Sequence, residues 1–100
     1  MTNAICKMFV TTTAVAHNDF SVNIDLSNLC GGNPNIVILQ NKHATVDISF
    51  LCSPIEPVST DQMLTLYAKT QIILDVAVPN QQIYFYQNSG GTVDMFTALA

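Results

Sequence analysis

Apolar and polar residues alternate with a period of two along most of the chain. Phe20, Val22, Ile24 and Leu26 alternate with polar residues, and the same pattern recurs over residues 46–50 and 72–78. Successive side chains of a β-strand point to opposite faces, so this period predicts strands with one buried and one solvated face. The abundant valine, isoleucine and threonine favour strands as well.

Turn residues divide the chain into short strand-like segments. We expect a β-hairpin in which residues 36–40 pair with residues 43–51 through a turn at Asn41-Lys42, and a second hairpin in which a loop at residues 88–91 joins residues 83–86 to 93–99. Residues 59–69 are ambiguous: Ser59 or Thr60 could cap a short helix, but the alternation of Leu64 and Leu66 with polar neighbours favours a strand.

Seven or eight short strands at this spacing predict an all-β fold. The short connections favour antiparallel pairing, and we expect a single domain over residues 1–100, an antiparallel β-sandwich of jelly-roll or immunoglobulin-like type. The sequence contains no internal repeat and no linker.

Composition limits the partners that the protein can bind. Only 10% of the residues are charged, against about 25% in typical domains. The formal net charge is −4 and the three basic residues are scattered lysines, which excludes the basic surface that nucleic acids or anionic membranes require. No apolar run is long enough to span a bilayer. The first residues also lack the basic start of a signal peptide.

No motif for catalysis or cofactor binding is present. The pairs Gly31-Gly32 and Gly90-Gly91 lack the spacing and the lysine of a phosphate-binding loop. The potential zinc ligands are far apart in the sequence, whereas zinc sites use ligands in close pairs. The number of cysteines is odd, which suits reduced, buried thiols better than a disulfide framework. These ligands are Cys6, His17, Cys30, His43 and Cys52. We therefore expect no enzyme activity, no cofactor and no metal.

The segment Ile83-Tyr84-Phe85-Tyr86 carries large side chains on both faces of a predicted strand. Ile83 and Phe85 would face the core, so the opposite face needs a second partner: another sheet, another subunit or a ligand. Tyrosine suits an interface because its ring buries area while its hydroxyl keeps a hydrogen bond. We expect Tyr84, Tyr86 and Tyr67 to contribute to an interface; an ordinary outer surface is the alternative.

Residues 64–97 resemble the closing strands of small β-rich phage virion proteins. The resemblance rests on a strand that ends in Pro79-Asn80, a strand that starts Ile83-Tyr84, a glycine-containing turn and a final strand. Head-decoration, collar and fibre-associated proteins share this pattern. The resemblance implies a structural role in a virion after synthesis in the host cytoplasm, and it assigns no individual functional residue.

The low charge favours the same hypothesis independently. Charged residues are depleted at the centres of interfaces, so a surface with few charges suits a protein that is covered by other subunits. We expect a homo-oligomer whose partners are copies of itself and other virion proteins. A monomer with a polar, uncharged surface is one alternative, and a β-sandwich module that binds a ligand or glycan is another.

Overall fold

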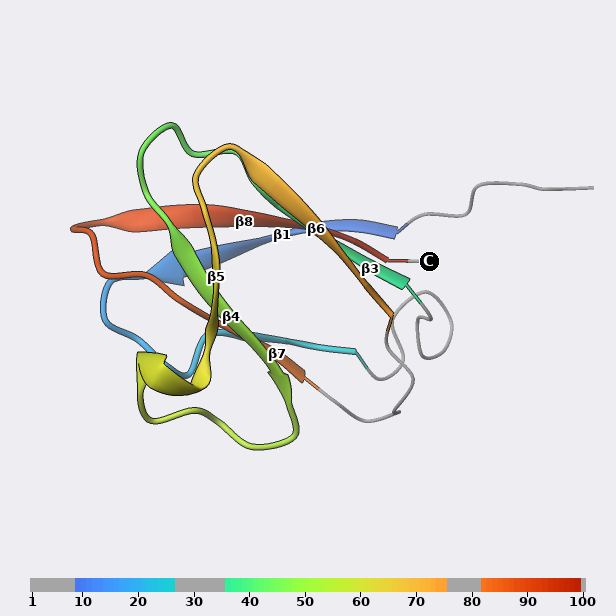
Figure 1. Cartoon of the computed structure of the whole chain (residues 1–100), viewed down its shortest axis with the longest axis horizontal. Helices are drawn as coiled ribbons and strands as arrows, with labels where there is room; N and C mark the ends of the chain where they lie inside the picture. The colour runs from blue at the N-terminus through green and yellow to red at the C-terminus, as the bar shows by residue number, and fades with distance from the viewer. Residues whose placement is uncertain (1–8, 27–35, 76–81, 100) are drawn as a thin grey trace, which may run out of the picture.

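The computed structural model describes residues 9–26, 36–75 and 82–99, which form eight strands and a single turn of 3-10 helix (Figure 1). The strands are β1 (Phe9–Ala16), β2 (Asn23–Asp25), β3 (Ile36–Asn41), β4 (Ile48–Ser53), β5 (Leu64–Leu66), β6 (Thr70–Asp75), β7 (Gln82–Tyr86) and β8 (Thr92–Leu99). The described residues contain no helix long and apolar enough to cross a membrane.

The strands form two four-stranded antiparallel sheets. Sheet I has the order β1-β8-β3-β6 and sheet II the order β2-β7-β4-β5. The predicted all-β antiparallel sandwich is confirmed. Of the two predicted topologies, the strand order matches the eight-stranded jelly roll and differs from the immunoglobulin arrangement.

Both predicted hairpins are wrong, although their strands exist. β3 lies in sheet I while β4 lies in sheet II, and β7 and β8 are separated in the same way. The chain changes sheet at every connection except the one between β4 and β5. The turns at Asn41-Lys42 and at residues 88–91 therefore carry the chain across the sandwich. Every pairing except that of β4 with β5 joins strands that are not consecutive in the sequence.

The ambiguous segment at residues 59–69 contains both predicted structures. Thr60–Gln62 form the 3-10 turn, and the Ser59 hydroxyl accepts a hydrogen bond from the Asp61 amide as its N-cap. β5 follows directly, and β6 begins at Thr70 after a turn in which Lys69 has a φ of 61°. Predictions for the first eight residues, for 27–35 and for 76–81, including Cys6, Cys30 and Pro79-Asn80, lie outside the described residues.

The core consists of the inward-facing residues of both sheets. Ile83, Phe85, Val37 and Leu39 are fully buried, as the alternation along their strands predicts. Thr97 also points into this layer, and its hydroxyl is buried without a hydrogen-bond partner. A buried hydroxyl that makes no hydrogen bond lowers stability.

Two other buried polar side chains form hydrogen bonds with both their amide nitrogen and their oxygen, and both lie where the chain changes sheet. Asn41 at the end of β3 donates to the carbonyls of Val46 and Leu66, at 2.8 and 3.2 Å, and accepts from the His43 amide. Gln87 after β7 makes four hydrogen bonds. It donates to the carbonyls of Val15 and Gly91 and accepts from the amide and hydroxyl of Ser89.

Replacing Gln87 with alanine should strongly destabilise the fold. Gln87→Ala leaves several backbone groups at the crossing from β7 to β8 without partners, and we expect the free energy of unfolding to fall by about 2–4 kcal/mol. Urea denaturation followed by circular dichroism measures the change. The matched substitution Gln71→Ala, on an exposed side chain of β6, should change stability by less than about 0.5 kcal/mol. Equal losses in the two variants would contradict the anchoring role of Gln87.

Replacing Thr97 with valine should stabilise the protein. Valine has nearly the same shape as threonine and removes the buried hydroxyl, so we expect a gain of about 0.5–2 kcal/mol in the free energy of unfolding. Thr92→Val, at an exposed position of the same strand, should lie within about 0.5 kcal/mol of the wild type. A marked loss of stability in Thr97→Val would show that the hydroxyl has a partner.

Candidate functional site

A row of apolar side chains crosses the outer face of sheet I. Val10 of β1 pairs with Ala98 of β8, Ala98 with Ile38 of β3, and Ile38 with Ile73 of β6. All four residues belong to the outward-facing set of their strands. Val10 and Ile73 remain 66% and 63% exposed, so the two ends of this apolar row are open to solvent.

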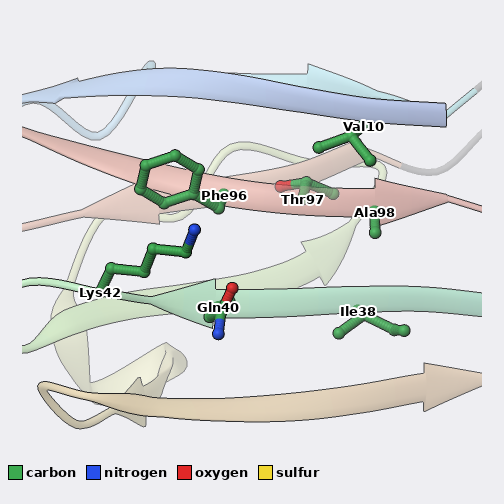
Figure 2. Close-up of a pocket in the computed structure, with 7 residues that line it drawn as sticks. All are labelled: Val10, Ile38, Gln40, Lys42, Phe96, Thr97 and Ala98. Atoms are coloured by element: carbon green, nitrogen blue, oxygen red, sulfur yellow. The ribbon is translucent and has the colours of Figure 1, made fainter.

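The neighbouring row on the same face is uncharged. It contains Thr12, Phe96, Gln40 and Gln71, which are paired in register across the four strands. Phe96 and Gln40 join members of the apolar row in lining a shallow hollow, which Figure 2 shows from outside the sheet. The two rows together place eight uncharged side chains at the middle of the face.

Charged side chains lie at the margins of this face. The Lys42 side chain extends from the end of β3 toward Phe96, and its Nζ lies 4.5 Å from the centre of the ring (Figure 2). A cation over an aromatic face is attracted by the negative charge of the ring's π-system. Asp94 lies in register with Ala14 at the same end of the sheet, and Asp75 pairs with Ile36 at the other end. The outer face of sheet I therefore has an apolar centre and a charged rim.

The sequence carries a partial signal for this face, of the same kind as the signal for the tyrosines. Residues 36–39 are continuously apolar, and Ile73 separates two apolar neighbours on β6. The inward positions supply the core, so Ile38 and Ile73 must point outward. Both stretches were visible as strands, but which of their two faces would be left uncovered depends on the pairing of distant strands.

Tyr84 and Tyr86 share the outer face of sheet II, as predicted from the alternation on β7. Tyr84 is only 6% exposed, and its hydroxyl donates to the Gln82 side chain. Tyr86 is half-buried: its ring stacks on Phe20 at 4.1 Å between centroids, and its hydroxyl donates to Asn18 Oδ1 at 2.6 Å. The chain itself thus supplies much of the second partner that this face was expected to need.

The loop that carries Phe20 is held by Asp19. Its Oδ1 accepts hydrogen bonds from the hydroxyl and the amide of Ser21, at 2.6 and 2.9 Å. These hydrogen bonds hold the pKa of the Asp19 carboxyl below its usual value, because they stabilise the ionised form. The loop thereby presents Phe20 to Tyr86 in a defined position.

Tyr67 lies apart from the other two tyrosines, directly after the edge strand β5. It is 63% exposed, and its carbonyl accepts hydrogen bonds from the amide and hydroxyl of Thr70. Leu64 of the same edge strand is also exposed. Tyr67 is therefore accessible for an interface, whereas Tyr84 is already buried within its own chain.

The candidate metal ligands in the described residues do not gather into a site. No group of three His, Cys, Asp or Glu side chains lies close enough there to hold an ion. His17 and His43 are exposed, and His43 Nδ1 accepts hydrogen bonds from the amides of Thr45 and Val46. Cys52 is a partly buried thiol, and burial raises its pKa because the thiolate would lose solvation.

Comparison with protein-family models, with curated proteins and with solved structures finds no match to this chain. The features that bear on function are the two outer faces of the sandwich and their side-chain chemistry. Sheet I presents an apolar and uncharged surface. Sheet II presents tyrosines that are largely engaged within the chain.

Replacing Tyr84 with serine should destabilise the fold rather than act on an interface alone. Tyr84→Ser removes a buried ring, and we expect a loss of about 3–5 kcal/mol in the free energy of unfolding, as for other buried aromatic residues. Tyr67→Ser removes the same atoms from an exposed site and should cost less than about 1 kcal/mol. Thermal and urea melting measure both values. A Tyr84→Ser variant as stable as Tyr67→Ser would contradict the structural role of the Tyr84 ring.

Proposed function

We propose that the protein is a non-enzymatic structural component of a virus particle and that it works in many copies. Its contact surface is the outer face of sheet I, and the occupant of that surface is the same face of a second copy. The observation that carries the proposal is the apolar row across all four strands of this sheet, with exposed Val10 and Ile73 at its ends.

The area of this face is of the order that a stable contact requires. Four strands at about 4.8 Å spacing and up to eight residues at about 3.3 Å each give roughly 19 by 26 Å in plan. Side chains raise the accessible area above that of the flat outline. Each partner in a standard protein interface buries about 800 Å², so a contact of that size would need the whole face together with its margins.

The distribution of charge favours a second copy as the occupant. A symmetric contact places one face against itself, and like charges at its centre would repel. Here the eight central side chains are uncharged and Asp94 and Asp75 lie at the margins, while the Lys42 ammonium lies over the Phe96 ring beside the hollow. Self-packing would therefore bury the apolar row, and the long Lys42 side chain would carry its ammonium to solvent at the edge of the contact.

The assignment to a virus particle has support of a different kind. The jelly-roll strand order is shared by viral capsid proteins and also by lectin and cupin domains, so it agrees with the assignment without deciding it. Two observations from the sequence also favour a virion protein. They are the resemblance of residues 64–97 to phage virion proteins and the low fraction of charged residues. Other virion proteins are the expected further partners, and Tyr67 on the edge of sheet II is accessible to them.

The assembly surface can be tested by sedimentation velocity of the purified protein. The wild type should sediment as a species larger than the 10.9 kDa chain. The double variant Ile38→Thr/Ile73→Thr keeps β-branched side chains and removes apolar surface from the centre of the face. Its dissociation constant should rise at least about tenfold. Circular dichroism should show an unchanged fold.

A matched double variant controls for general hydrophobicity. Ile55→Thr/Val58→Thr acts on two residues that are even more exposed, at 74% and 81%, but that lie in the loop between β4 and β5. It should assemble like the wild type. An equal effect of both variants would reject the sheet I surface, and a wild type that stays monomeric at high concentration would reject self-assembly. Absence of the protein from purified particles of its source would reject the virion assignment.

A further inference from the structure

A polar hollow lies on the outer face of sheet II, on the opposite side of the sandwich from the apolar row. Its floor is a row of three residues paired in register: Tyr86 of β7, Ser49 of β4 and Thr65 of β5. The serine has the smallest side chain of the three and stands in the middle, which makes the floor concave. Asp47 and three further polar residues, Thr60, Gln87 and Asn88, complete the lining.

Most of the polar groups in this hollow are unused. The side chains of Ser49, Thr60, Thr65 and Asn88 have no hydrogen-bond partner among the described residues. The Asp47 Oδ1 accepts from the Ala68 amide at 2.9 Å, which leaves its second carboxylate oxygen available. The hollow therefore offers three hydroxyls, one amide and one carboxylate to a ligand.

Several of the lining groups are held in place before any ligand arrives. The Tyr86 ring is clamped between its stack on Phe20 and its hydrogen bond to Asn18. Gln87 at the end of the same strand is fixed by its four hydrogen bonds. The bond from the Ala68 amide orients Asp47. Groups ordered in advance lose less conformational freedom on binding, so a small ligand can be held by few contacts.

The chemistry of the lining selects the class of ligand. Hydroxyl and amide groups both donate and accept, and the Asp47 carboxylate accepts strongly, so the hollow suits a molecule with several neutral hydroxyls. No basic residue lines it, and the carboxylate would repel an anion. We propose that this hollow binds a single neutral hexose unit, with Asp47 accepting from its hydroxyls and the Tyr86 side chain forming part of the floor. This site is separate from the proposed assembly surface and does not depend on it.

The test is a two-dimensional ¹H–¹⁵N NMR titration with four separate probes: D-glucose, D-galactose, D-mannose and N-acetyl-D-glucosamine. At least one should shift the amide signals of residues 47–49, 60, 65 and 86–88 in a saturable way, with a dissociation constant in the millimolar range typical of contacts worth about 4 kcal/mol. Signals of the apolar row should stay unchanged. Inorganic phosphate should leave the hollow unshifted.

Two variants and one control link the signal to the hollow. Ser49→Leu fills its floor and should abolish the shifts, while Thr45→Leu, an exposed threonine in the loop after β3, should bind like the wild type. Asp47→Asn keeps the oxygen that accepts from Ala68 but removes the charge, so affinity should fall about tenfold. The spectra also report whether each variant is folded. If Ser49→Leu does not fold, the affinity of Asp47→Asn tests the site by itself.

Four results would overturn the proposal. They are no saturable shift with any of the four sugars, binding that survives both Ser49→Leu and Asp47→Asn, binding of phosphate in place of sugar, and a sugar that shifts only signals on sheet I. Failure of self-assembly would leave this result unaffected, because the two surfaces are on different sheets.

Discussion

The buried amide side chains of Asn41 and Gln87 hold the two sheets together at the points where the chain passes between them. Asn41 ends a strand of sheet I and donates to the carbonyl of Leu66 in sheet II. Gln87 follows a strand of sheet II and donates to the carbonyl of Val15 in sheet I. Burying an amide side chain costs free energy unless its hydrogen bonds are made. Each of these two residues therefore favours the chain path that brings its hydrogen-bond partners to it.

This arrangement decides which faces of the strands remain outside. Because both sheets direct alternate residues to a shared core, the other half of each strand is free to take a separate role. Sheet I uses those positions for an uncharged apolar surface, and sheet II uses them for tyrosines and small hydroxyl side chains. The two outer faces therefore differ in chemistry, with an apolar row on one side and a polar hollow on the other.

The low number of charged residues has a different physical effect on each outer face. On sheet I it leaves the middle of the apolar row free of repulsion against an identical surface. On sheet II it leaves hydroxyls and one carboxylate to define the hollow, without a lysine that would attract phosphate or nucleic acid. One property of the composition thus supports both proposals through different physical effects.

The sequence by itself determined the class of fold, the positions of most strands and the inward direction of Ile83 and Phe85. These features follow from the period of two, which is local and can be recognised without knowing any partner strand. The same local signals also explain the wrong hairpins. Asn41-Lys42 and residues 88–91 look like tight turns, and nothing near them in the sequence says whether the next strand returns to the same sheet or crosses to the other.

Only the tertiary structure decided which strands pair, which polar residues are buried and which apolar residues are exposed. Pairing in this fold joins strands that are far apart in the sequence, such as β1 with β8, so it depends on the packing of the whole sandwich. Asn41 is polar in the sequence and fully buried in the fold, while Ile73 is apolar and exposed. Tyr84 and Tyr86 look equivalent on β7, yet Tyr84 is buried and Tyr86 is half-buried and lines a hollow.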